Sequence, residues 1–409
     1  MKNEPTPPMS LQERMETSLA ALEAAGNLRT LKEVVPDGTY LLHGGQRYLN
    51  LSSNDYLGLS ASEYAGVDLA AYWDSRFGAA FPRSAFAHGN PASRLMTGNS
   101  AEYAAVEAEL AALFPGKAAL VLGCGFMANS GLMPAVAEKG DLVLADKLVH
   151  ASIIEGLQHT AAEFRRFPHN DVAALERQLQ RAAAGQCVWV IIESLYSMDG
   201  DLAPLQEILE LKRRYGFHLY VDEAHSFGTC GPQGAGCCAA LGAAEEVDVL
   251  VVTFGKALAG AGAAVICSPL MRQYLVNRMR TLIFSTALPP ATLMWVAMVL
   301  HEMRTESLHC EQPECYAGMA ARREHLAELV RWWTEQTGIP ATSQIIPLPC
   351  GSNERALAVA EQGRAAMLWL TAIRHPTVPA GTARIRLSLH AALTQQELQP
   401  LLTLCRNLG

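Results

Sequence analysis

Short apolar runs alternate with helical patterns through the middle of the chain, from about residue 100 to residue 290. Uninterrupted Val, Ile and Leu runs predict buried strands, and their expected bounds are 118–122, 142–145, 188–192, 219–221 and 249–252. Apolar residues at helical spacing predict helices between them, over 101–113, 130–137 and 172–184. Parallel strands joined by helical crossovers form a doubly wound sheet, so this region is predicted to be a large α/β domain.

The two ends of the chain carry a different pattern. Residues 10–35 predict an amphipathic helix, and two apolar runs around His43-Gly44-Gly45 predict a hairpin. A long helical region over about 291–337 leads into shorter alternating elements and a final helix at 395–405. We therefore expect an N-terminal helix and hairpin segment (1–60), a large domain (61–290) and a smaller C-terminal α+β domain (291–409) that the N-terminal segment completes.

Composition and charge narrow the class of function. The chain has 409 residues, half of them hydrophobic, which is enough for a large core. A formal charge of −8 without a basic run argues against nucleic acid as a partner. The 12 histidines and 10 cysteines show neither metal-site nor disulfide-framework spacing. The polar, proline-rich start has no apolar region typical of a signal peptide, and the most apolar stretch, 288–300, is too short for a membrane span. We expect a cytoplasmic protein without a metal site.

A lysine follows the strand expected at 249–252, in Thr253-Phe-Gly-Lys256. A lysine at the end of a buried strand can lose part of its charge by desolvation, and a neutral amine is a nucleophile toward aldehydes. A solvated lysine that merely ends the strand is the ordinary alternative.

The strand expected at 219–221 ends in the same way, with Asp222 followed three residues later by His225. Open α/β sheets bind ligands at the carboxyl ends of their strands, so these side chains and Lys256 are expected in one crevice. A carboxylate for a heteroaromatic nitrogen, a histidine for a phenolic oxygen and a Schiff-base lysine make a pyridoxal phosphate (PLP) site. Alone, Asp-x-x-His also fits a metal pair or a structural hydrogen bond.

These stretches resemble the α-oxoamine synthase family of fold-type I PLP enzymes, from Ser52-Ser53-Asn54-Asp55 to the last strand. The resemblance implies an α/β, aspartate aminotransferase-like transferase, with a large, mostly parallel seven-stranded sheet domain and a smaller C-terminal α+β domain. Residues 371–387 are similar to the branch that joins L-alanine to a pimeloyl thioester and releases CoA or a carrier protein and CO₂. They are less similar to the glycine acetyltransferase, aminolevulinate synthase and serine palmitoyltransferase branches. A homodimeric acyltransferase with active sites at the interface is the implied form.

The resemblance also implies a role for each site residue. The cofactor phosphate would be bound by the amides of Gly125 and Phe126, by Ser197 and Thr253, and by Thr286 from a neighbouring subunit. The cofactor ring would be bound by His150 stacked on it, Asp222 at its nitrogen and His225 at its phenolic oxygen, and Lys256 would be the Schiff-base lysine. The catalytic residues would be Lys256, Asp222, His150 and His225.

The substrate-binding residues would be Arg29, Asn54, His150, Thr377 and Arg386. Arg384 stays open as an alternative to Arg386, because residues two apart on a strand lie on the same face. For Arg29, a solvated arginine at a helix end is the alternative.

Three departures from the family pattern leave the catalytic class unchanged and leave the identity of the acyl substrate open. Gly89-Asn-Pro91 replaces a glycine-rich segment, Tyr103 stands where the family has a histidine, and His375 replaces a proline. Residues 221–236 are similar to the synthases of quorum-sensing aminoketones. A glycine C-acetyltransferase, an aminoketone synthase and a catalytically silent family scaffold are the alternatives. Retention of the lysine, aspartate and histidine described above argues against the scaffold.

Overall fold

The computed structural model describes residues 9–61, 66–306 and 318–406, and contacts divide the chain into two units. The larger unit comprises Ser53–Ile345 and Leu389–Thr394; the smaller comprises the described parts of Met1–Ser52, Ile346–Ser388 and Gln395–Gly409.

The boundary predicted after residue 290 differs from this division. Helices α11 (Pro290–Thr305) and α12 (Met319–Thr337) belong to the larger unit, and α11 packs against α3 (Ala101–Leu113). Most of the α11 side chains are buried, because this helix is apolar on several sides. A change of pattern at residue 290 therefore marks a change from sheet to helix packing within one unit. Residues 307–317 of the predicted helical region lie outside the described residues.

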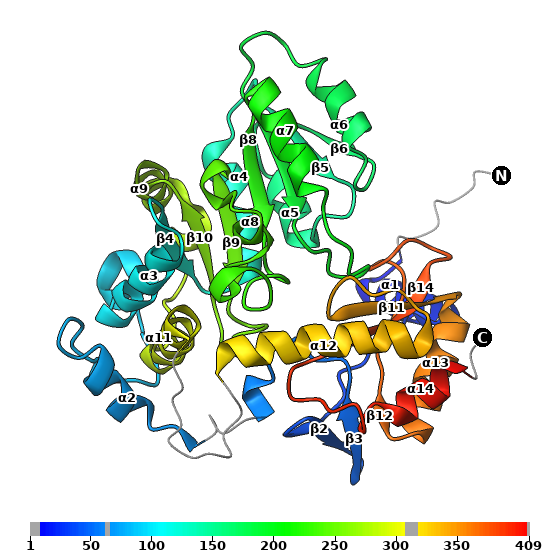
Figure 1. Ribbon diagram of the computed structural model, residues 1–409. Helices are drawn as coiled ribbons and strands as arrows, with labels where there is room; N and C mark the ends of the chain where they lie inside the picture. The colour runs from blue at the N-terminus through cyan, green and yellow to red at the C-terminus, as the bar shows by residue number, and fades with distance from the viewer. Residues whose placement is uncertain (1–8, 62–65, 307–317, 407–409) are drawn as a thin grey trace. The chain divides into compact units, whose positions relative to one another are not determined.

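A seven-stranded sheet forms the centre of the larger unit (Figure 1). Its strands, in spatial order, are β4 (Ala118–Leu122), β10 (Ala263–Cys267), β9 (Val249–Thr253), β8 (His218–Asp222), β7 (Val188–Glu193), β5 (Leu142–Asp146) and β6 (Glu163–Phe167). Strand β10 is antiparallel to β4 and β9, and the other neighbours are parallel. The predicted mostly parallel sheet is confirmed, as are its five predicted strands.

Strands β6 and β10 were not predicted. Strand β6 is an edge strand whose sequence, Glu-Phe-Arg-Arg-Phe, is largely exposed and therefore lacks an apolar run. Strand β10 is fully buried, but it begins with two alanines directly after the glycine-rich segment that ends at Gly262. Neither pattern reaches the Val, Ile and Leu content that indicates a strand.

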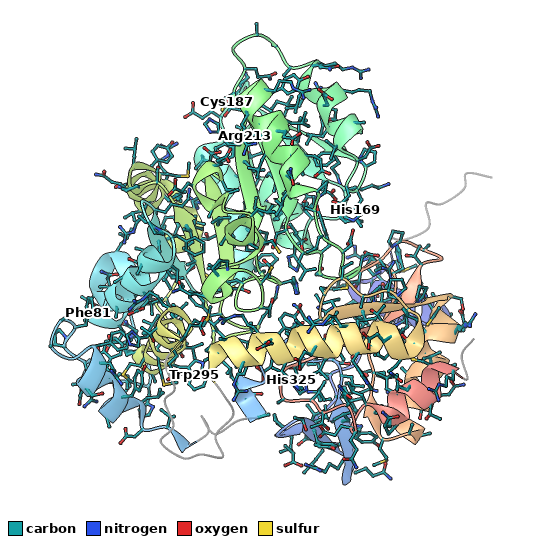
Figure 2. All side chains as sticks on the ribbon, in the orientation of Figure 1. Phe81, His169, Cys187, Arg213, Trp295 and His325 are labelled. Carbon is teal, nitrogen blue, oxygen red and sulfur yellow. The ribbon has the colours of Figure 1, made fainter. Side chains whose placement is uncertain are left out.

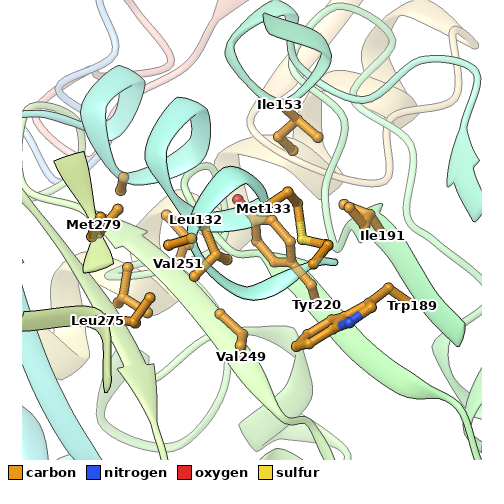
Figure 3. Close-up of a cluster of buried hydrophobic side chains, with 14 of the residues drawn as sticks. Leu132, Met133, Ile153, Trp189, Ile191, Tyr220, Val249, Val251, Leu275 and Met279 are labelled. Carbon is orange, nitrogen blue, oxygen red and sulfur yellow. The ribbon is translucent and has the colours of Figure 1, made fainter. Parts of the chain in front are cut away.

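Helices α4 (Gly125–Val136), α5 (Ala151–Gln158) and α9 (Pro269–Arg278) pack on the sheet through a common apolar cluster (Figure 3). Leu132 and Met133 of α4 meet Tyr220 of β8 and Val251 of β9 there. This packing fixes the N-terminus of α4 beside the strand ends. The other helices of the larger unit are α2 (Leu69–Arg76), α6 (Val172–Leu179), α7 (Leu205–Tyr215), α8 (Cys237–Ala240) and α10 (Arg280–Ile283).

The smaller unit contains two sheets. The first has the order β1 (Val35–Asp37), β2 (Tyr40–His43), β3 (Gln46–Asn50) and β12 (Leu368–Trp369), and the second has β11 (Ile345–Gly351), β14 (Ala383–Ser388) and β13 (Ala372–Ile373). The predicted hairpin is β2–β3, and its turn residues Gly44 and Gly45 have φ values of 58° and 77°. Such left-handed values favour glycine.

The helices of the smaller unit are α1 (Leu11–Ala24), α13 (Asn353–Ala365) and α14 (Gln399–Arg406). Helix α1 is shorter than the predicted 10–35. Gly26, with a φ of 62°, follows its C-cap, and the amides of Asn27 and Leu28 donate to the Leu22 carbonyl. This closure ends the helix, because the last carbonyls are satisfied by a turn instead of a further helical residue.

None of the described helices is long and apolar enough to cross a membrane. The described cysteines are free thiols, and the described residues contain no group of His, Cys, Asp and Glu side chains able to hold a metal ion.

Candidate active site

The carboxyl ends of β4, β5, β7, β8 and β9 surround a cavity of about 330 Å³ within the larger unit. Asp222 and Thr253 are the last residues of their strands, and Lys256 follows Thr253 by three residues. All three line the cavity, together with His150 and His225. The crevice expected from the sequence is therefore present, and it forms because parallel strands end at one edge of a sheet.

Asp222 is 3% exposed, and both of its oxygens accept hydrogen bonds. Oδ2 accepts from Asn129 Nδ2 at 2.7 Å, and Oδ1 accepts from the Ala224 amide at 2.9 Å. Asn129 Oδ1 in turn accepts from the Tyr220 hydroxyl. These donors hold both oxygens of the carboxyl group in place at the cavity.

Lys256, His225, Tyr56 and Asn54 form a hydrogen-bonded row. Lys256 Nζ lies 2.8 Å from His225 Nε2, and His225 Nδ1 lies 2.7 Å from the Tyr56 hydroxyl, which donates to Asn54 Oδ1 at 3.1 Å. Every contact has a donor when Nε2 accepts from the lysine and Nδ1 carries the imidazole proton. The row holds the amine at the cavity and places Asn54 at its far end.

His150 is the N-cap of α5, and its Nδ1 lies 2.7 Å from Ser152 Oγ. Asn129 Nδ2 also donates to this hydroxyl, at 3.0 Å, which connects His150 to the Asp222 side of the cavity. Desolvation lowers the pKa of the His150 ring; the charge of Asp222 opposes this change and that of Lys256 adds to it. A neutral imidazole suits stacking on an aromatic ring and exchange of a proton with a substrate.

The N-terminus of α4 fits a phosphate group. Gly125 and Phe126 are its first residues, and the side chain of the N-cap residue, Cys124, makes no capping hydrogen bond to the described residues. A Cβ atom at Gly125 would lie 2.7 Å from Thr253 Cγ2, so glycine is needed for the helix to approach β9. Free amides at the start of a helix bind anions. The amine, carboxylate, imidazoles and amides together match what PLP requires.

Two of the expected cofactor residues do not line this cavity. Ser197 lies nearly buried in the loop after β7, and Thr286 forms an isolated β-bridge with Ser93. Tyr103, which stands in place of the family histidine, is 1% exposed; its hydroxyl accepts from the Leu288 amide at 2.6 Å. The Arg94 guanidinium lies 4.0 Å from the Tyr103 ring centre, so this departure is part of the packing.

The remaining substrate-side residues belong to the smaller unit. Arg29 Nη2 donates to Thr377 Oγ1 at 3.4 Å, and both line a second cavity of about 830 Å³. Arg386, on β14, is 7% exposed and donates from Nη1 to Ser388 Oγ at 2.7 Å. Arg384 is more exposed and donates to the Thr382 carbonyl. The two arginines therefore differ in burial, although they were expected on one strand face.

Sequence reasoning missed Asn129, Glu193 and Tyr56. Asn129 lies four residues after Gly125, on the same face of α4, so helical spacing was an available signal. Glu193 ends β7 as Asp222 ends the next strand, and it also lines the cavity. Tyr56 carried no signal of its own, because only the tertiary structure brings it to His225.

Comparisons with known proteins agree with this geometry. The family model for aminotransferase class I and II matches residues 46–404. An 8-amino-7-oxononanoate synthase from Chlorobaculum parvum is 41% identical over 408 residues, which cover 98% of this chain and 100% of that protein. A putative 8-amino-7-oxononanoate synthase from Glaesserella parasuis is 40% identical, and the match covers 94% of this chain and 98% of that protein.

Solved structures show the same architecture. A serine palmitoyltransferase variant from S. paucimobilis with a bound PLP–myriocin aldimine superimposes with a TM-score of 0.84 at 26% identity, covering 98% of both chains. An 8-amino-7-oxononanoate synthase from Francisella tularensis has a TM-score of 0.67 at 23% identity, covering 88% of this chain and 98% of that one, and shares the fold.

The fold and the cavity thus define a PLP-dependent enzyme of fold type I. The chain belongs to the aminotransferase class I and II family, in the α-oxoamine synthase branch that includes its 8-amino-7-oxononanoate synthase relatives.

Proposed function

We propose that this protein condenses L-alanine with a pimeloyl thioester, carried by CoA or a carrier protein, to give 8-amino-7-oxononanoate and CO₂. The observation that carries the proposal is the full-length similarity to the C. parvum synthase, at 41% identity over 98% of the chain. The cavity supplies the groups that this chemistry requires, because it combines an amine, a buried carboxylate and a helix N-terminus at one sheet edge.

PLP, when bound, supplies an electron sink for negative charge at the amino acid Cα. Lys256 would hold the cofactor, and its amine would take the proton from the amino acid Cα. Its contact with His225 keeps Nζ directed at the cavity. Asp222, which Asn129 holds in place, would keep the ring nitrogen protonated. His150, which lines the cavity, would stack on the ring and contact the substrate.

The proposed phosphate ligands are the amides of Gly125 and Phe126 with the hydroxyls of Ser197 and Thr253. Thr286 would contribute from a neighbouring subunit, so the active form would be a homodimer with its sites at the interface.

The free thiols of the described cysteines agree with the expected cytoplasmic location.

On the substrate side, we propose that Arg386 binds the amino acid carboxylate. A guanidinium offers bidentate hydrogen bonds to a carboxylate, and Arg386 is the more buried of the two β14 arginines. Asn54, at the end of the lysine–histidine–tyrosine row, would face the amino acid. Arg29 and Thr377, which contact each other, would meet the acyl substrate.

The first experiment is the visible spectrum of the purified protein with PLP, followed by separate additions of L-alanine and glycine. A band that shifts with L-alanine, and release of CoA from pimeloyl-CoA, are expected. A shift with glycine alone would identify a glycine acetyltransferase, and turnover only with long acyl chains would identify an aminoketone or long-chain synthase. Lys256→Ala should abolish both the band and turnover, and normal activity in this variant would exclude the proposed site. A wild-type protein that binds no PLP would indicate the silent scaffold.

A further inference from the structure

Two cysteines that the proposed function does not use lie in contact within the larger unit. The Cys237 thiol donates a hydrogen bond to Cys230 Sγ, and the two sulfur atoms are 3.5 Å apart. Cys230 is partly buried, and Cys237 is 7% exposed. An S–S bond is about 2 Å long, so an approach of about 1.5 Å would bring the two sulfur atoms to bonding distance.

The backbone holds the two cysteines close to each other. Gly236, the residue before Cys237, donates its amide to the Cys230 carbonyl at 2.8 Å. Its φ of 100° is a left-handed value that favours glycine. The Cys230 amide donates to the Ser226 carbonyl at 2.9 Å, and the Cys237 amide donates to Glu223 Oε2 at 2.9 Å. Both main-chain segments are therefore anchored, and the separation of the sulfur atoms changes mainly by rotation of the two side chains.

Both cysteines line a cavity of about 290 Å³ that shares no lining residue with the candidate active site. Its other lining residues come from the loop after β7, from the start of α7 and from the region of α8. Two of them, Leu202 and Leu241, are 46% and 51% exposed, so the cavity opens to solvent. Among the described residues that line it, Glu207 is the only charged one. The cavity therefore gives a small, uncharged molecule access to the thiols.

The hydrogen bond between the thiols makes them unequal. Because the Cys237 thiol donates to it, the pKa of Cys230 is lowered, although burial and the charge of Glu223 oppose this change. The same hydrogen bond raises the pKa of Cys237, and burial and the charge of Glu223 add to this rise. The thiolate is the form of cysteine that attacks a disulfide. Cys230, which is also the more exposed of the two, is therefore the attacking group.

We propose that Cys230 and Cys237 are a reversible modification site, at which a low-molecular-weight disulfide converts the two thiols to an intramolecular disulfide. The Cys230 thiolate attacks one sulfur of the reagent and forms a mixed disulfide, and the released thiolate takes up the proton that Cys230 lost. The Cys237 sulfur then attacks Cys230 Sγ, and the bond between Cys230 and the reagent breaks. The second thiolate of the reagent leaves with the Cys237 proton. Two protein thiols are oxidised, and one external disulfide is reduced to two thiols.

The test exposes the reduced wild-type protein, freed of reductant, to 2-hydroxyethyl disulfide. The remaining thiols are then alkylated with iodoacetamide in denaturant, and the tryptic peptide 215–256 is analysed by mass spectrometry. This peptide contains three cysteines, Cys230, Cys237 and Cys238. We expect it to lose two hydrogen atoms, to bear no reagent and to carry a single alkyl group. Treatment with dithiothreitol before alkylation should restore alkylation of all its cysteines, because a dithiol reverses the exchange.

Single substitutions identify the bonded pair. Cys237→Ser should trap the mixed disulfide, so that Cys230 keeps one reagent group. Cys230→Ser should leave Cys237 unmodified, because the buried thiol has lost its attacking partner. Cys238→Ser is the matched control, since Cys238 is the next residue, is 1% exposed and does not line the cavity. This control should form the intramolecular disulfide as the wild type does.

A wild-type peptide in which every cysteine is still alkylated would overturn the proposal, provided that the exposed Cys124 has reacted with the reagent in the same sample. A stable reagent group on Cys230 of the wild type, or an internal disulfide that persists in Cys237→Ser, would also overturn it. The wild-type measurement decides the question if a variant does not fold. Neither PLP nor an acyl substrate takes part, so the result is independent of the proposed function.

Discussion

Replacement of His169 should destabilise the larger unit in a pH-dependent way. His169, labelled in Figure 2, lies between two carboxylates: Nδ1 is 2.9 Å from Asp146 Oδ1, and Nε2 is 2.8 Å from Asp201 Oδ2. Burial lowers the pKa of the ring, but the hydrogen bonds and charges of Asp146 and Asp201 outweigh it and raise the pKa to about 10. The ring is thus an imidazolium that donates from both nitrogens.

The size of the effect follows from this pKa. A rise from the unfolded value of about 6.5 to about 10 corresponds to an upper limit of about 5 kcal/mol. The side chains of His169 and Asp201 are 24% and 38% exposed, so solvent screening reduces the expected contribution to about 1–3 kcal/mol. Because the folded pKa is the higher one, this contribution is fully present below pH 6.5 and is lost as pH rises through about 10.

The assay is urea unfolding of the wild type and His169→Gln at pH 6, 8 and 10. We expect the free energy of unfolding of the variant to be lower by about 1–3 kcal/mol at pH 6, with the difference shrinking toward pH 10. His159→Gln is the control, since His159 is 65% exposed and lies 3.8 Å from Glu155, and it should change stability by less than about 0.5 kcal/mol. A difference that does not change with pH, or an NMR titration of His169 near pH 6.5, would refute the reasoning.

The same histidine also supports the candidate site. Asp146 accepts the backbone amides of Leu148 and Asn170, at 2.7 and 2.8 Å, and Leu148 lies two residues before His150. Loss of His169 leaves two carboxylates facing each other beneath this loop. We therefore expect His169→Gln to weaken PLP binding as well, although it does not line the cavity.

Other substitutions test single parts of the site. Asp222→Asn should still bind PLP but lower turnover by roughly 100-fold, because the ring nitrogen loses its charged partner; an unchanged rate would remove this role. Gly125→Ala should weaken PLP binding by roughly tenfold, since the added Cβ would lie 2.7 Å from Thr253 Cγ2 and move the helix N-terminus, and a titration of apo-protein measures it. Arg386→Leu should raise the KM for L-alanine by roughly tenfold or more, and Arg384→Leu should raise it less. The opposite order in steady-state kinetics would assign the carboxylate to Arg384.

The alternation of apolar runs and helical patterns was enough to predict the main sheet, because buried parallel strands are uninterrupted apolar segments whatever their neighbours are. It also placed Asp222 and Lys256 correctly. Asp222 directly follows one such predicted strand and Lys256 follows another closely, and parallel strands end at one edge of the sheet. Strand β6 was not predicted, because an exposed edge strand does not need that apolar pattern.

Only the tertiary structure decided which side chains complete the site. Asn129 and Asp222 are 93 positions apart, and Tyr56 and His225 are 169 apart, so no local pattern records these hydrogen bonds. Local periodicity determines the elements and the residues at their ends, whereas hydrogen-bond partners and pKa shifts depend on distances that chain folding alone establishes.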